Sequence, residues 1–435
     1  MTQTLFRIAT LLFAVAVLLC GHGLQLTLLP MRAEVLGWSA SAIGISGSAY
    51  FLGFIVGCLS VPSLVGRVGH IRAFTVMGAT AALALLAVGL LDVLAAWLVL
   101  RFATGYALSG LYMVIESWLS EAAAPNSRST VLAVYTLISL LAMAAGQGFL
   151  AFGAPDDLHL IMIGAMLLCA ATIPIGLTRM AAPHPLPATR FSLRTLLSAS
   201  RVAVVTAFFG GLVTGAIWSV GPLVGRALGM EGGAVGALMG SLILGGALAQ
   251  LPVGRLSDRT DRRVVIAGLL CAGTALGLAG FFLPPSPDSG LFALMFLIGA
   301  VSMPIYALCI ATASDNASVS MIEIASGILI MNSLGSILGP VVVAGLIGVM
   351  GGGGFFLYVA VAFGLAAAWA FYRIATVERP RGGDQAFVGL PRTTPVAAEL
   401  SLPEMPQIDA AGHVTPPEKS LVDEADDTGI ARAAR

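Results

Sequence analysis

The sequence contains few charged residues. Only 10% of its 435 residues are Asp, Glu, Lys or Arg, whereas 58% are hydrophobic. A soluble domain carries about 25% charged residues to cover the surface that faces water. This scarcity excludes an ordinary soluble fold, so lipid must be the solvent for most of the chain. The formal net charge is zero, which argues against nucleic acid as a partner.

Cysteine is also scarce, and the thiols are not clustered. A disulfide framework or a zinc site needs closely spaced cysteines, and the five histidines are equally scattered. We therefore expect no disulfide, no metal and no other cofactor. The cysteines are Cys20, Cys58, Cys169, Cys271 and Cys309.

The short motifs of ATP-driven and hydrolytic proteins are missing. No G-x-x-x-x-G-K-[ST] phosphate loop occurs, so this chain is not expected to hydrolyse ATP. No G-x-S-x-G or H-E-x-x-H occurs either, and we expect no enzymatic activity. The glycine run 351–354 follows no strand and is interpreted as a turn before an apolar segment.

The sequence consists mainly of long apolar runs. A membrane-spanning helix needs about 20 mostly apolar residues. The first run extends from Arg7 to about Pro30, which exceeds the roughly 7–15 residues of a signal-peptide core, so it is predicted to be a retained span. The twelve predicted spans are 7–30, 42–65, 72–92, 95–119, 130–152, 158–178, 201–223, 234–256, 263–283, 290–312, 323–349 and 354–376.

Arginines fall mainly on one side of this map. If the N-terminus is inside, the outside loops hold only Arg32 and Arg226. Such a bias follows the positive-inside rule. We therefore expect a protein of the inner membrane with both termini in the cytoplasm. The inside arginines are Arg7, Arg67, Arg72, Arg128, Arg179, Arg190, Arg194, Arg201, Arg255, Arg259, Arg262, Arg263, Arg373, Arg379 and Arg381.

The spans divide into two sets of six. We predict an all-α membrane protein with twelve transmembrane helices in two pseudo-symmetric bundles, residues 1–178 and 201–376. Residues 179–200, which are rich in proline and arginine, are predicted to link them in the cytoplasm. Residues 377–435 are rich in Pro, Ala, Asp and Glu and have the composition of a disordered tail.

The second half repeats landmarks of the first at an offset of 192 residues. The matching pairs are Gly44 and Gly236, Gly53 and Gly245, Leu64 and Leu256, and Arg67 and Arg259. Two parallel six-span repeats suggest a transporter with its binding site between the halves.

The loop after the eighth span carries a specific motif. Residues 254–263 read GRLSDRTDRR, and the first-half counterpart, residues 62–72, reads PSLVGRVGHIR. The first resembles the G-x-L-[AS]-D-[RK]-x-G-[RK]-[RK] loop of the major facilitator superfamily, with Asp261 in place of a glycine. The second keeps Leu64, Arg67 and Gly69 but has Gly66 where the family has an acid.

The resemblance implies a cytoplasmic latch that forms in one conformation and breaks in another. Asp258 can accept from helix-end N–H groups or pair with an arginine; alternatively, the arginines only anchor the topology. The predicted latch residues are Arg67, Arg72, Gly254, Asp258, Arg259, Arg262 and Arg263. Residues 112–118 (YMVIESW) and the run from Tyr306 to Pro340 are similar to the YcaD-like branch of the superfamily.

Arg101 and Glu116 are charged residues inside the fourth span. A charge at the bilayer centre costs about 2.5–3.5 kcal/mol on insertion scales, so retained charges usually face a cavity. Arg101 and Gly105 resemble the family's R-x-x-x-G motif, and Tyr112 lies on the same helix face. Arg101 either serves substrate or coupling there, or extends to headgroups. Glu116 either accepts a proton or pairs with Arg67 or Arg72.

Other polar and aromatic residues in the spans are candidate cavity residues. His22 and Gln25 in the first span either act in transport, where histidine titrates near physiological pH, or make a structural hydrogen bond. Trp218, Tyr306 and Asn332 either line the cavity or serve packing and interfacial belts.

These features predict a secondary transporter that moves a small solute by alternating access. Without a nucleotide site its energy would come from a gradient, and we expect protons. We expect a monomer in the lipid bilayer. Span five, around Gly146 to Gly148, lacks the Gly-Pro signature of drug–proton antiporters. The alternative is a non-transporting sensor or scaffold on the same fold, with residues 377–435 as its output.

Overall fold

The structure is a computed structural model of the full chain. It describes residues 2–123, 128–177, 193–283, 286–315, 321–376, 394–395, 407–408 and 414–415. In these residues twelve helical segments are long and apolar enough to cross a membrane, as the sequence predicts.

The first half contains six spans. They are α1 (Thr2–Val35), α2 (Ala40–Val68), α3 (His70–Leu90), α4 (Leu94–Ala122), α5 (Arg128–Gly148) with the 3₁₀ turn η2 (Phe149–Phe152), and α6 (Leu158–Ala170) with α7 (Thr172–Gly176).

The second half repeats this arrangement after a short helix, α8 (Leu193–Ala199). Its spans are α9 (Arg201–Ala227), α10 (Gly232–Arg259), α11 (Arg262–Phe282), α12 (Ser289–Ser302) continued by α13 (Pro304–Ser314), α14 (Met321–Met350) and α15 (Gly353–Thr376). A two-residue pairing of β1 (Gln407–Ile408) with β2 (Val414–Thr415) lies beyond the last helix.

Local sequence explains several helix ends. The side chains of Ser39, Asp157 and Asp288 accept from backbone N–H groups at the starts of α2, α6 and α12, which satisfies donors that have no partner in the helix. The tenth span is interrupted at Met303 because Pro304 has no N–H to continue the ladder and instead starts α13.

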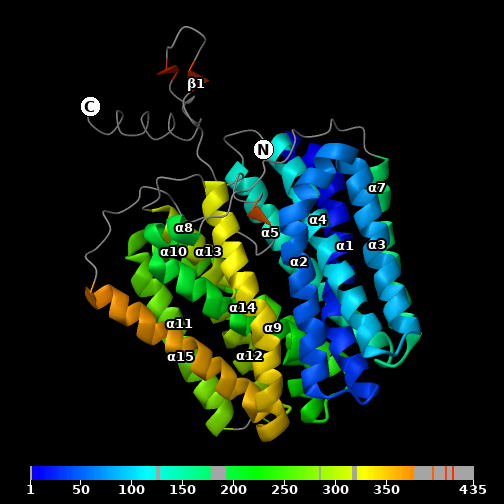
Figure 1. The fold of residues 1–435 in the computed structure, drawn as a ribbon, viewed down its shortest axis with the longest axis vertical. Coiled ribbons are helices and arrows are strands. Elements are labelled where there is room, and N and C mark those ends of the chain that lie inside the picture. The colour runs from blue at the N-terminus through cyan, green and yellow to red at the C-terminus, as the bar shows by residue number, and fades with distance from the viewer. Residues whose placement is uncertain are drawn as a thin grey trace, which may run out of the picture.

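Close glycine contacts hold each half together in the same way. A Cβ at Gly53 of α2 would overlap the carbonyl oxygen of Phe102 in α4, and a Cβ at Gly245 of α10 would overlap that of Phe296 in α12. Small residues allow helices in lipid to approach closely. The predicted repeat therefore corresponds to equivalent packing in the two halves, which lie side by side in Figure 1.

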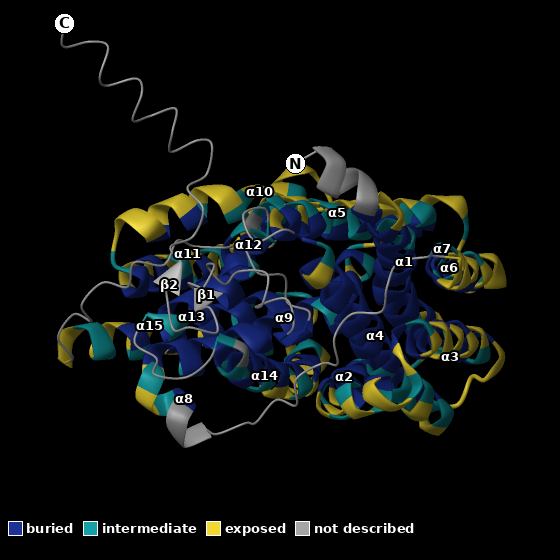
Figure 2. Ribbon diagram, turned by 90° about the horizontal axis from the view of Figure 1, so that it is seen from above, coloured by how far each residue is buried: buried dark blue, intermediate teal, exposed yellow. Residues whose placement is uncertain are grey.

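The outer faces of the bundles are exposed and apolar. Leu83, Val99, Leu251 and Leu365 are among the large hydrophobic side chains that remain exposed. Figure 2 shows exposed positions around the periphery and buried positions in the centre. Such a surface is stable only against lipid.

Two predicted segments lie mainly outside the described residues. Residues 179–192 of the predicted linker are not described, and residues 193–199 form α8. Of the predicted tail, residues 377–435, only 394–395 and the two short strands are described, so its predicted disorder stays a prediction.

Candidate functional site

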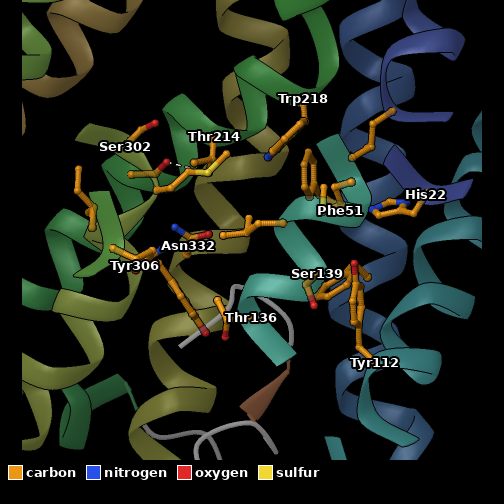
Figure 3. Close-up of a pocket in the computed structure, with 18 of the residues that line it drawn as sticks. His22, Phe51, Tyr112, Thr136, Ser139, Thr214, Trp218, Ser302, Tyr306 and Asn332 are labelled. Atoms are coloured by element: carbon orange, nitrogen blue, oxygen red, sulfur yellow. Dashed lines mark hydrogen bonds between the residues drawn. The ribbon is translucent and has the colours of Figure 1, made fainter. Parts of the chain in front are cut away.

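A cavity lies between the two halves. It encloses about 1130 Å³ of empty space, its mouth included. Eight spans contribute to it: α1, α2, α4 and α5 of the first half, and α9, α10, α12 with α13, and α14 of the second. Its lining is His22, Leu26, Tyr50, Phe51, Phe54, Tyr112, Thr136, Ser139, Leu140, Met143, Gly210, Thr214, Trp218, Gln250, Ser302, Met303, Ile305, Tyr306 and Asn332, part of which is drawn in Figure 3.

Corresponding positions of the two halves line opposite sides of the cavity. At the offset of 192 residues, His22 and Leu26 in the first span correspond to Thr214 and Trp218 in the seventh. Leu140 in the fifth span corresponds to Asn332 in the eleventh. In Figure 3 Tyr112 and His22 point into the space from one side and Tyr306 from the other. The repeat thus places the lining as well as the scaffold.

The halves contact each other at one end of the cavity. A Cβ at Gly44 of α2 would collide with the carbonyl oxygen of Pro340 in α14, and a Cβ at Gly236 of α10 would collide with that of Gln147 in α5. Ser48 also donates its hydroxyl to the carbonyl of Ile337. Because glycine lets the backbones touch, this end is sealed by main chain.

An ion pair completes the sealed end. The Nε of Arg226, near the end of α9, donates to Oε2 of Glu34, near the end of α1, at 2.9 Å. Both side chains are partly exposed, at 29% and 36%. The pair joins the two halves at the helix ends that the arginine bias places outside the cell.

The cavity begins where these contacts end. Along α2, Tyr50 and Phe54 follow Gly44; along α10, Gln250 follows Gly236. Along α14, Asn332 precedes Pro340, in the opposite chain direction. Each helix therefore passes from a contact between halves into the cavity as it runs towards the predicted cytoplasmic side.

Five of the eight predicted substrate or coupling residues line the cavity. They are His22, Tyr112, Trp218, Tyr306 and Asn332. Gln25, Arg101 and Glu116 do not line it but are buried close to residues that do. Their roles in transport remain predictions, and each of the three has a distinct environment.

His22 and Gln25 belong to one hydrogen-bond chain. Nε2 of Gln25 donates to Nδ1 of His22 at 2.8 Å. Nε2 of His22 lies 3.4 Å from the hydroxyl of Tyr50. With Nδ1 accepting, the remaining proton of the ring sits on Nε2 and points to Tyr50. The structural hydrogen bond and the cavity position that the sequence offered as alternatives are therefore both present.

Arg101 lies behind this chain. Its side chain is buried, and its guanidinium lies 4.8 Å from the centre of the Tyr50 ring, within the range of a cation–π contact. It borders a small second cavity with Ser46 and Ser219, and its Nη1 has no hydrogen-bond partner. The alternative in which Arg101 extends to headgroups does not fit this burial.

Glu116 is fully buried on the predicted cytoplasmic side of the cavity. It accepts a hydrogen bond from the hydroxyl of Tyr135 at 3.0 Å, and its other oxygen accepts from Thr394 of the tail. Arg67 and Arg72 are exposed, and no ion pair joins either of them to Glu116 in the part of the chain that the structure describes. The alternative of an ion pair with these arginines is therefore not realised in this conformation.

The ion pairs described for the latch residue Arg262 are made within the second half. Nη1 of Arg262 pairs with Asp315 at 2.6 Å, and Asp258 lies 3.6 Å from Nη2 of Arg262. Burial raises the pKa of the Asp315 carboxyl, and the neighbouring guanidinium opposes that shift. The described ion pairs of the latch do not cross to the first half, where Arg67 and Arg72 are exposed, as is Arg259 in the second. Gly254 is buried and its carbonyl accepts from Ser257.

Asp261 explains the departure from the family motif. Its Oδ1 accepts from the backbone N–H of Arg263 at 2.9 Å, which caps α11, and its Oδ2 pairs with Nη2 of Arg263 at 2.9 Å. An aspartate at this helix start satisfies a free N–H group, a role that a glycine side chain could not perform.

Several site residues were not among the predicted ones. Glu34 and Arg226 close one end, and Thr136, Ser139 and Gln250 supply polar groups to the cavity. The 192-residue offset was the available signal for the ion pair, because it relates Glu34 to Arg226.

The comparisons with known proteins agree with this architecture. The sequence profile of the Major Facilitator Superfamily matches residues 203–404. A protein of Salmonella arizonae named uncharacterized MFS-type transporter YcaD is 26% identical over 343 residues, which cover 75% of this chain and 87% of the relative. A protein of the same name from Salmonella paratyphi A is 25% identical over 339 residues, with the same coverage.

Solved transporters share the fold. A variant of the nucleoside transporter NupG aligns with a TM-score of 0.70 at 16% identity, covering 85% of this chain and 100% of that one. The Escherichia coli fucose:proton symporter FucP aligns with a TM-score of 0.55 at 16% identity, covering 85% and 99%. The chain is a multi-pass membrane protein. It is similar to the major facilitator superfamily over residues 203–404 and to the YcaD-type transporters of that family over three quarters of its length.

Proposed function

We propose that the protein is a secondary active transporter that carries a small solute through the central cavity by alternating access. The observation that carries this proposal is the asymmetry of the cavity, which is sealed at one end by contacts between the halves. A static scaffold does not need a buried space between two bundles. A transporter does, since each end must open in turn.

The conformation is the inward-facing state of this cycle. The positive-inside rule places Glu34 and Arg226 on the outer side, so the sealed end faces outwards. The protein then sits in the inner membrane with both termini in the cytoplasm.

Glu116 is the proposed proton carrier. Glu116 is a carboxyl group buried inside a span, and this group can bind and release a proton. The residue lies on the cytoplasmic side of the cavity, and its bond from Tyr135 fixes its position. Protonation and release in alternate states would couple the proton gradient to the solute. A fucose:proton symporter shares the fold, which is consistent with this coupling.

A sided labelling experiment tests the proposal without knowledge of the solute. Ser139 lines the cavity, and the five native cysteines are free thiols, so Ser139→Cys would be introduced into a chain whose own cysteines are replaced. A membrane-impermeant maleimide should label it rapidly from the cytoplasmic side and slowly from the outside. The two labelling rates would be measured again after a change of pH or after addition of a mixture of candidate solutes. Rates that change in opposite directions support alternating access, whereas equal and unchanging rates contradict it.

A further inference from the structure

The described residues that line the cavity include no Asp, Glu, Lys or Arg. The two charged groups nearby are withdrawn from it: Arg101 lies against the ring of Tyr50, and the carboxylate of Glu116 is bonded to Tyr135 and Thr394. A charged solute that entered would lose its hydration without gaining a counter-charge. The lining therefore selects against ions.

Asn332 offers the cavity a fixed acceptor. Its Nδ2 donates to the carbonyl of Ala207 at 3.0 Å, which sets the orientation of the amide, because a carbonyl can bond only the NH₂ side. Its Oδ1 is buried and has no hydrogen-bond partner, and the residue as a whole is 1% exposed. An unpaired buried acceptor is costly, so a donor on the solute would satisfy it.

Gln250 presents a second acceptor from another helix of the second half. Its Oε1 is also buried without a partner, and the residue lines the same cavity. The two amide oxygens come from α14 and α10. They therefore suit a solute that carries more than one N–H or O–H group.

Both halves contribute aromatic side chains to the wall. Phe51, Phe54 and Tyr112 come from the first half, and Trp218 and Tyr306 from the second. Figure 3 shows Trp218 and Phe51 near one another at one side of the space and Asn332 with Tyr306 at another. Aromatic side chains favour flat partners that can stack on their faces or meet their edges.

We propose that the transported solute is an uncharged planar ring compound, aromatic or heteroaromatic, that carries hydrogen-bond donors. Its ring packs between the aromatic side chains of the two halves, and its donors bond Oδ1 of Asn332 and Oε1 of Gln250. This inference rests on the proposed function, because it names the class of solute for the same cavity.

Ligand-induced stabilisation of the purified full chain tests the class. Each probe is a ring offered in matched forms: nicotinamide, its N,N-dimethyl derivative without donors, nicotinate as the anion and 1-methylnicotinamide as the cation. Uridine and thymidine extend the uncharged set, and glucose and glycerol supply donors without an aromatic ring. Because stabilisation follows affinity, at least one uncharged ring compound should raise the unfolding temperature, with matched ions and the N-alkylated form binding at least about tenfold more weakly.

Variants of the amides make the test specific. Gln250→Leu should weaken binding of the uncharged donor compounds by about tenfold, and Gln250→Glu should add binding of the cation. Asn332→Leu should abolish the preference for N–H over N-alkyl forms. Thr274→Val on α11, whose hydroxyl bonds Leu270 within its own helix, is the matched control and should change nothing.

Three outcomes overturn the proposal: stabilisation only by charged probes, stabilisation only by the sugars or glycerol, or no stabilisation by any uncharged ring compound. The proposed function is judged separately by the sided labelling of Ser139→Cys, which needs no known solute. Alternating labelling rates together with binding of ions alone would retain the transporter and reject the solute class.

Discussion

Glu34 and Arg226 occupy corresponding positions of the two halves, 192 residues apart, and their side chains form an ion pair at 2.9 Å. One internal repeat has thus supplied an acid and a base at equivalent places. The pair lies where α1 and α9 end, beyond the glycine contacts that seal the cavity. In the proposed cycle it must break whenever the outer side opens.

Neutralising this pair should favour the outward-open state. Glu34→Gln or Arg226→Gln removes an attraction worth about 0.2–1 kcal/mol for a partly exposed pair. The ratio of outward-open to inward-facing protein should therefore rise by up to about fivefold. The outside labelling rate of Ser139→Cys should rise accordingly. The exchanged pair Glu34→Arg with Arg226→Glu is the matched control and should restore the original rate. No change in the single variants would contradict a gating role.

Glu116→Gln should uncouple transport from protons. The amide keeps the size of the side chain and can still meet Tyr135, but it cannot carry a proton across. Uptake driven by a pH gradient should fall to the background level, whereas exchange of labelled for unlabelled solute should continue. Tyr135→Phe, which removes only the positioning hydroxyl, should retain part of the gradient-driven rate. Gradient-driven uptake in the Gln variant would show that another group carries the proton.

Gly53→Ala and Gly245→Ala should destabilise the fold to similar degrees. Each new Cβ would overlap a carbonyl oxygen of the neighbouring helix, Phe102 or Phe296. Overpacking of this kind costs about 1–3 kcal/mol, which should appear as a lower unfolding temperature in detergent. Gly268→Ala, at an exposed position with open space around the new Cβ, is the control. A loss in only one of the two glycine variants would contradict equivalent packing of the halves.

Removal of residues 377–435 should leave transport active and raise its rate. Thr394 bonds Glu116, and this contact must be released when the cytoplasmic side closes. Initial uptake rates of the truncated and full chains in proteoliposomes measure the effect, with Thr394→Val as the matched single change. Loss of all transport on truncation would contradict this expectation and would make the tail essential to the transport cycle.

The hydrophobic pattern predicted the twelve spans because each is a long apolar run, and the repeat predicted their division into two halves. Helix ends differed most where polar groups are satisfied inside the protein. Arg32 was placed in a loop, but α1 continues to Val35 because the guanidinium bonds the carbonyls of Gly89 and Asp156. Lengths of apolar sequence carry no information about such distant partners.

The sequence predicted a cavity lined by polar and aromatic residues, but it predicted only some of the residues that line it. His22, Tyr112 and Asn332 stood out because polar groups in lipid are costly, and all three line the cavity. Thr136 and Ser139 did not stand out, since a hydroxyl can bond the carbonyl of its own helix, as both do. Which side of a helix faces the cavity depends on packing between halves, which one sequence does not contain.

Distances between spin labels at both ends of the cavity test alternating access most directly. Val35→Cys with Ala227→Cys labels exposed positions at the sealed end, and Ser63→Cys with Thr260→Cys labels exposed positions at the cytoplasmic ends of α2 and α10. Double electron–electron resonance on the full chain in lipid, at several pH values, should show the outer distance lengthening as the inner one shortens. Two distances that stay constant, or that change in the same direction, would contradict the account.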